Sequence, residues 1–238
     1  MRETQQPITI NTVIVIRILA GIAVFLVLAS AAGQLARFLG GHETLYGLVR
    51  MFFLDKENNI PTYFSSGILL ISACLLAVIA VLKKRERDLF AGHWTALAVI
   101  FLLFSMDEAS STHELLTSPV RHLLHTSGFL YFAWVIPGLA FVCAVAIIFW
   151  KFLIHLPLQT RRLFVVAAIV YIAGVIGTEL VAGWYVELYT RNNLTYSFLA
   201  MLEETLEMIG VIVFVYALLD YMTVEVGEVR FRVRSNST

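Results

Sequence analysis

The feature that most constrains the fold of this chain is a series of long apolar blocks. Each is close to the roughly 20 apolar residues that a helix needs to cross a bilayer. The six blocks cover residues 18–38, 63–82, 94–114, 128–150, 163–183 and 200–220. Backbone groups in lipid must be paired within the segment, and the blocks lack the alternation of barrel strands. The sequence therefore predicts an all-α fold, a polytopic membrane bundle of six transmembrane helices.

The composition agrees with this prediction. Of the 238 residues, 59% are hydrophobic and 14% are charged, whereas a soluble domain is usually about 45–50% apolar and about 25% charged. A net charge of zero gives no reason to expect nucleic acid as a partner. Cys74 and Cys143 both fall inside apolar blocks, which favours two membrane-buried thiols over a disulfide or a metal pair.

The basic residues predict the orientation of the bundle. If the N-terminus is cytoplasmic, 12 lysines and arginines face the cytoplasm and five face outward. This asymmetry follows the positive-inside rule and favours an arrangement with both termini in the cytoplasm, in a plasma membrane or a bacterial inner membrane. Residues 1–223 then form the transmembrane domain, and residues 224–238 form a cytoplasmic basic tail.

Three segments have open or minor interpretations. The first block is alternatively a signal peptide cut near Ala31, which would leave five spans. Residues 44–54 are expected to form a short helix on the outer surface. Residues 224–233 alternate with period two, which is typical of a strand, but a frayed basic end is favoured.

The acidic residues gather at one predicted depth. With this topology 11 carboxylates fall on the outer side and six on the inner side. The third block is apolar only up to Met106, so Asp107 and Glu108 are expected below the outer interface. Glu179 in the fifth block and Glu207 in the sixth reach a similar depth. Ionisable groups inside a membrane usually face the bundle interior or a water-filled cavity, so these carboxylates are expected to converge.

The expected convergence defines a candidate site. On a continuous third helix Asp107, Ser111 and Glu114 would share one stripe. Predicted metal ligands are Glu108, His113, Glu114, Glu179, Glu204 and Glu207. Asp107 and Glu203 are predicted as catalytic proton carriers behind them. Candidate basic partners for the carboxylates are Arg121, Arg191, His113, His122 and His125.

Several functions are compatible with such a site. Helical carboxylates and a histidine that face a bundle core bind iron or manganese in other proteins, and an all-oxygen set suits calcium, magnesium or manganese. The favoured hypothesis is a metal-dependent or proton-handling membrane enzyme that faces the extracytoplasmic side and acts on a lipid-soluble or cationic ligand. Alternatives are an ion- or proton-coupled transporter, a non-catalytic subunit of a membrane complex, and acids that only cap helix ends. An oligomer is compatible with all of them.

Three sequence motifs carry a resemblance. They are Asn59-Ile60-Pro61-Thr62, then Asp107-Glu108 followed after four intervening residues by His113-Glu114, then Glu203-Glu204 with Glu207-Met208 and Gly210. In these motifs the chain resembles uncharacterised prokaryotic multi-pass membrane proteins. The resemblance implies no activity.

Overall fold

A computed structural model describes residues 11–226, and every regular element in that range is helical. The long helices are α1 (Thr12–Phe38), α3 (Ile60–Arg85), α4 (Ala91–Ser110), α6 (Val135–His155), α7 (Leu158–Ile172), α8 (Glu179–Leu188) and α9 (Leu194–Tyr221). The shorter ones are η1 (Leu45–Gly47), α2 (Leu48–Phe52), η2 (Thr112–Leu116), α5 (Thr117–Leu124), η3 (Gly128–Leu130), η4 (Ala173–Thr178) and η5 (Met222–Val226). The predicted all-α fold is confirmed for this part of the chain.

Five helical segments are long and apolar enough to cross a membrane. They are Thr12–Phe38, Ile60–Arg85, Val135–His155, Leu158–Leu188, which joins α7, η4 and α8, and Leu194–Val226. Ala91–Ser110 and Thr112–Leu124 meet the same criterion only together, and they join at an angle of 78°. The described residues therefore contain five of the six predicted spans, or all six if this bent pair counts as one span.

Asparagine caps begin three of these helices. The side chain of Asn11 accepts hydrogen bonds from the backbone N–H groups of Val13 and Ile14. The helix therefore starts six residues before the predicted residue 18, since the cap satisfies free N–H groups at its first turn. Asn59 caps α3 in the same way, with Pro61 in the first turn, and Asn193 caps α9. Asn59 and Pro61 therefore mark the start of the second span, three residues before the apolar block that begins at residue 63.

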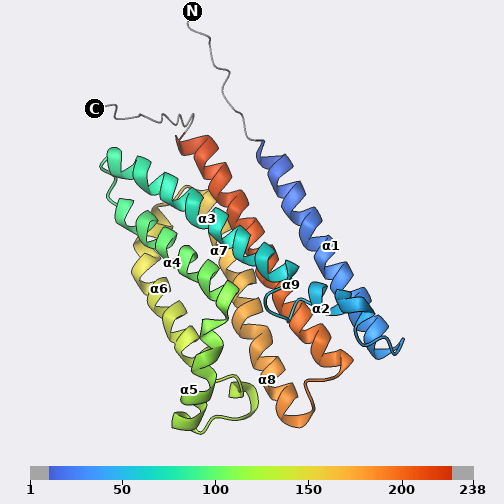
Figure 1. Cartoon of the computed structure of the whole chain (residues 1–238). Helices are drawn as coiled ribbons and strands as arrows, with labels where there is room; N and C mark the ends of the chain where they lie inside the picture. Colours follow the sequence, from blue (N-terminus) through green and yellow to red (C-terminus); the bar gives the residue numbers. More distant parts are fainter. Residues whose placement is uncertain (1–10, 227–238) are drawn as a thin grey trace, which may run out of the picture.

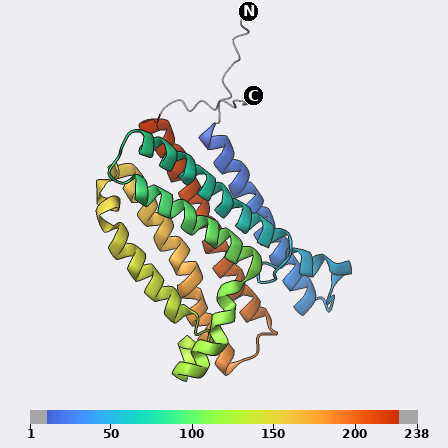
Figure 2. The ribbon, with the colours of Figure 1, turned by 60° about the vertical axis from the view of Figure 1, so that its left-hand side comes forward.

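Helix α9 lies in the middle of the bundle and packs against α1, α3 and α7. In both ribbon views α1 and α6 lie at opposite edges (Figures 1 and 2). Helix α1 begins and α9 ends at the same face of the bundle, which we call the terminal face (Figure 1). The carboxylates of the predicted site lie toward the other face, where α4 turns into η2 and α5.

Two glycines allow α7 and η4 to approach α9 closely. A Cβ atom built on Gly210 would lie 2.8 Å from the backbone nitrogen of Tyr171, and one on Gly174 would lie 3.0 Å from the carbonyl oxygen of Glu203. Small residues at membrane helix contacts permit such approaches. Because of this contact, the acidic face of α9 lies directly against η4.

The helix expected within residues 44–54 is present as η1 and α2. Its side chains are not all at the surface, since Val49, Phe53 and Leu54 are buried. Of the predicted tail, residues 224–226 belong to the π-helical turn η5 that continues α9, and residues 227–238 lie outside the described part. The alternating pattern predicted for residues 224–233 is therefore helical where it is described.

Candidate functional site

One cavity of about 1360 Å³, which we call the chamber, lies among α4, α6, α7, α8 and α9. It reaches the loops at the face opposite the terminal face. All eight predicted site residues line it: Asp107, Glu108, His113, Glu114, Glu179, Glu203, Glu204 and Glu207. The structure thus brings together side chains from α4, η2, α8 and α9.

The third span does not continue as a straight helix. Helix α4 ends at Ser110, and Ser111 adopts a left-handed conformation with φ 46° and ψ 40°. The predicted stripe of Asp107, Ser111 and Glu114 on one helical face is therefore wrong. A non-glycine residue in this region usually marks a turn, and here the turn bends the chain by 78° and allows His113 to contact Asp107 of α4.

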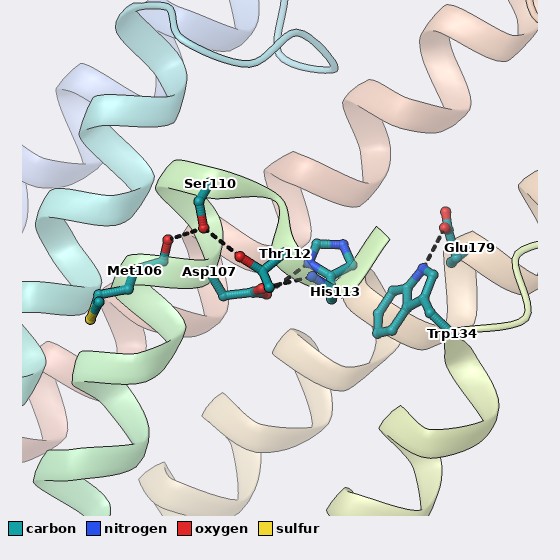
Figure 3. Close-up of polar contacts among 7 residues, drawn as sticks. All are labelled: Met106, Asp107, Ser110, Thr112, His113, Trp134 and Glu179. Carbon is teal, nitrogen blue, oxygen red and sulfur yellow. Dashed lines mark hydrogen bonds and ion pairs between the residues drawn. The ribbon is translucent and has the colours of Figure 1, made fainter. Parts of the chain in front are cut away.

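The turn brings His113 against Asp107, and the two form an ion pair when the imidazole is protonated. The Nδ1 atom of His113 lies 2.7 Å from Oδ2 of Asp107, and the backbone N–H of His113 donates to Oδ1 at 2.8 Å (Figure 3). Both side chains are about one-third exposed. Two bonds to one carboxylate hold the imidazole in a single orientation at the wall of the chamber.

Trp134 connects this pair to the carboxylate of α8. Its ring centroid lies 4.5 Å from that of His113. Its indole Nε1–H donates a hydrogen bond of 2.9 Å to Oε1 of Glu179 (Figure 3). A buried tryptophan usually finds such an acceptor. Asp107, His113, Trp134 and Glu179 therefore form one contiguous polar wall.

The acids of α9 face η4 across the close helix contact. A Cβ atom on Gly174 would lie 3.1 Å from Cγ of Glu207, so a larger residue there would press on this side chain. The η4 segment is a π-helical turn, and its Thr178 hydroxyl bonds back to the carbonyl of Gly174. Such turns are frequent at functional sites. We use the term carboxyl layer for six residues of the chamber: Asp107, Glu108, Glu179, Glu203, Glu204 and Glu207.

Most of the carboxyl layer has no cationic partner. Among the described residues, ion pairs join only His113 to Asp107 and Lys83 to Glu86. Arg121 lies over the ring of Tyr131 at 3.6 Å, and Arg191 lies over the ring of Phe132 at 4.7 Å. Of the predicted basic partners, only His113 meets a carboxylate.

The structure does not support the predicted metal site. Among residues 11–226, no group of three or more histidine, cysteine and acidic side chains is arranged to hold a metal ion. The six predicted ligands share the chamber, but a metal needs several donors at about 2.0–2.6 Å from one point. The six side chains therefore line one cavity without surrounding a single metal position.

The mouth of the chamber carries basic side chains, which we call the basic rim: Arg37, Arg50, Lys56, Arg121 and Arg191. The guanidinium of Arg37 donates a 2.6 Å hydrogen bond to the side-chain oxygen of Asn192. Asp55 lies among them, between α2 and α3. Burial raises the pKa of Asp55 from 3.8 to about 6, although Lys56 lowers it.

The Asp55→Asn variant is expected to be more stable than the wild type above about pH 6 and equally stable near pH 4. The Asp55 carboxyl group binds its proton more tightly in the folded state than in the unfolded state. Protonation therefore stabilises the folded state fully below pH 3.8, and this stabilisation is lost as the pH rises through about 6. A shift of about two units corresponds to at most about 3 kcal/mol. Thermal unfolding in detergent across this range measures the difference. Glu57→Gln, at an exposed neighbour, is the control, and a pH-independent gain in Asp55→Asn would contradict the assignment.

The other part of the chamber is apolar. Its lining residues between the carboxyl layer and the terminal face carry no charge. Phe152 and Phe164 line its end, and both pack against Trp94, with ring centroids 5.0 Å apart for Trp94 and Phe152 and 6.1 Å apart for Trp94 and Phe164. We call this part the apolar branch. The chamber therefore has a basic mouth, an acidic middle and an apolar end.

Two residues that line the chamber were not predicted from the sequence. Trp134 was not singled out, although a tryptophan within a predicted span requires an acceptor for its indole N–H. Tyr171 also lines the chamber, next to the contact with Gly210. No spacing signal identifies Tyr171, because its position depends on how α7 packs on α9.

Comparison with known proteins places the chain in a family. A family model described as a domain of unknown function, DUF8692, matches residues 18–222. No curated protein and no solved structure matches the chain. The resemblance to uncharacterised proteins is consistent with this description, which mentions none of the three motifs. Because the match covers all of the long helices in whole or in part, the chain belongs to the DUF8692 family.

Proposed function

We propose that this protein is a polytopic membrane protein whose working part is the carboxyl layer, which takes up and releases protons for a lipid-soluble or cationic ligand. The observation that carries the proposal is that Glu108, Glu204 and Glu207 line one chamber without an ion pair or hydrogen bond among the described residues. Neighbouring carboxylates in a membrane cannot all stay ionised without compensation. They therefore share protons or meet a cationic ligand.

The polar wall supports a role for Asp107 and His113 as the proton carriers. Their ion pair is partly exposed to the chamber, so a proton on the imidazole reaches both the carboxyl layer and water at the mouth. Histidine is suited to this exchange because its charge changes near neutral pH. Glu203 is proposed to pass protons between Glu179 and the acids of α9.

The proposed orientation has the mouth on the extracytoplasmic side of a plasma or bacterial inner membrane and both termini in the cytoplasm. It rests on the distribution of lysine and arginine, which is 12 against five. A cysteine at Ser118 in α5, introduced by Ser118→Cys, should react in intact cells with a membrane-impermeant maleimide. Reaction only after lysis would reverse the orientation.

Infrared spectroscopy of the purified protein tests the proton-bearing carboxyl groups. We expect a carbonyl band of protonated carboxylic acids at neutral pH, which shifts in deuterium oxide and weakens in Glu204→Gln and Glu207→Gln. The matched control is Glu86→Gln, because Glu86 pairs with Lys83 near the terminal face. A spectrum without this band at neutral pH would refute the proposal.

Proton-coupled transport is the second candidate, and one observation favours it. Phe152 lines both the chamber and a smaller cavity of about 150 Å³ near the terminal face, which Lys83, Asp88 and His155 also line. The carboxyl layer and this smaller polar cavity, separated by the apolar branch and by the ring of Phe152, suit a path that opens on one side at a time. A pH-driven ion flux in liposomes that stops in Glu204→Gln would favour transport over catalysis.

A further inference from the structure

The apolar branch is a long space whose walls come from separate helices. Its lining residues include Leu97 and Phe104 of α4, Phe141 of α6, Ala168 and Ile169 of α7, and Phe214 of α9. Helix α6 is fastened at both ends: Val135 packs with Ile176 at one end, and Phe152 packs with Trp94 at the other. Between these ends α6 makes few close backbone approaches to its neighbours, which leaves the branch open.

The length of the branch matches one lipid chain. On α4 the branch extends from Glu108 to Leu97, which are eleven residues apart. At 1.5 Å per residue this is about 16 Å. The hydrocarbon core of a bilayer is about 30 Å thick, so one leaflet, and one chain of a lipid, occupies about half of it.

The walls suit a hydrocarbon tail. Phe141 and Ile169 line the branch and are 43% and 62% exposed, so both have apolar surface that no other side chain covers. Ligand sites are usually apolar cavities with a few polar groups that fix orientation. Here the polar groups are gathered at one end of the branch, where the carboxyl layer begins.

The charge at that end selects the head group. Glu108, Glu204 and Glu207 face the chamber without a cation among the described residues, and the imidazole of His113 is already bonded to Asp107. An ammonium group placed there would complement the carboxylates, whereas a carboxylate or sulfate head group would be repelled. The ring of Tyr171 beside Phe104, with centroids 6.2 Å apart, adds an aromatic face for a cation.

The basic rim discriminates against a free inorganic cation. Five lysine and arginine side chains line the mouth against three acids there, Asp55, Glu57 and Glu114, so a small cation from water meets an excess of positive charge before it reaches the carboxyl layer. An amine attached to a long hydrocarbon tail partitions into the bilayer first. The tail, not the charge alone, then brings the ligand to the chamber.

We infer that the apolar branch binds the tail of a long-chain amine whose ammonium group lies against the carboxyl layer. The inference rests on the proposed function, because it assigns a ligand class to the same carboxyl groups. It goes further by assigning a role to the apolar branch, which proton exchange does not require.

Binding of hexadecylamine to the full chain in lipid nanodiscs tests the inference. We expect stoichiometric binding measured by calorimetry, at least tenfold tighter than binding of hexadecanol, hexadecyl sulfate or butylamine. These probes lack the charge, reverse it or lack the tail. Equal binding of hexadecylamine and hexadecanol would refute the role of the carboxyl layer, and equal binding of butylamine would refute the role of the branch.

Two variants locate the ligand. Ala168→Trp places a large side chain in the branch, and Ala144→Trp makes the same change at an exposed position of α6 that does not line the chamber. Ala168→Trp should weaken hexadecylamine binding at least tenfold, and Ala144→Trp should leave it unchanged. Equal effects of the two would overturn the location, provided that both variants elute as the wild type does in gel filtration.

Glu204→Gln separates this inference from the proposed function. It should weaken hexadecylamine binding at least tenfold without changing hexadecanol binding. If the infrared band of protonated carboxyl groups is present but Glu204→Gln binds hexadecylamine like the wild type, the ligand class fails while proton exchange stands. If hexadecylamine binding depends on Glu204 but the infrared band is absent, proton exchange fails and the amine site stands.

Discussion

Replacement of Gly210 by alanine is expected to lower the free energy of unfolding by about 1–3 kcal/mol, the usual cost of overpacking a tight contact. The added Cβ atom would lie 2.8 Å from both the backbone nitrogen and Cβ of Tyr171, and 2.9 Å from its Cα. Two of these atoms belong to the backbone of α7, so no side-chain rotation relieves the clash. Helices α7 and α9 must separate, and the acids of α9 move away from η4. The midpoint of thermal unfolding in detergent measures the loss.

Gly67 in α3 provides the matched control. It is also a helical glycine, but a Cβ atom built on it would meet no atom within 4 Å. Gly67→Ala should be neutral or slightly stabilising, because alanine is the better helix former. If Gly210→Ala and Gly67→Ala have the same unfolding midpoint, the close contact of α7 with α9 is refuted.

The ion pair of Asp107 with His113 is expected to show a coupling free energy of roughly 1–3 kcal/mol in a double-mutant cycle with Asp107→Asn and His113→Gln. The pair combines a charge-assisted bond of 2.7 Å with a backbone bond of 2.8 Å to the same carboxylate, and both groups are partly buried. Either single variant leaves a polar group at the chamber wall without its partner, so the double variant should lose less than the sum. Thermal unfolding of the four proteins gives the cycle.

The pair of Lys83 with Glu86 is the control for this cycle. Its bond of 2.9 Å is short, but the side chain of Glu86 is 53% exposed. Exposed pairs of this spacing on a helix usually contribute less than about 1 kcal/mol. A coupling at Asp107 and His113 no larger than that at Lys83 and Glu86 would show that the turn at Ser111 is held by other contacts.

The membrane character of the chain could be predicted because it depends on local sequence. A helix pairs its own backbone groups, so a block of about 20 apolar residues predicts a span whatever surrounds it. Helix starts could be predicted for the same reason, since Asn59 and Pro61 act within one turn of α3. Asn11 carries the same signal, and its effect lies six residues before the start that hydropathy alone predicts.

The candidate site could be predicted only as a depth. Depth follows from the position of an acid along its helix, and Glu108, Glu179 and Glu207, which the sequence groups by predicted depth, line one chamber. The prediction of which side of the helix each residue faces is wrong after Ser110, because the chain turns at Ser111. On a straight helix Asp107 and His113 would lie about 120° apart around the axis, and only the left-handed residue between them allows their contact.

The sequence by itself determined that this chain is a bundle of apolar helices, and it predicted that several carboxylates lie at one depth. Both properties follow from chemistry within single segments. Only the tertiary structure decided which carboxylates have partners: Glu179 meets Trp134 from another helix, and Glu204 and Glu207 meet no cation among the described residues. The approach of α7 to α9 and the distance of α6 from both also shape the chamber. They depend on contacts between segments distant in the chain, and apolar blocks of similar composition do not encode which of their faces will meet.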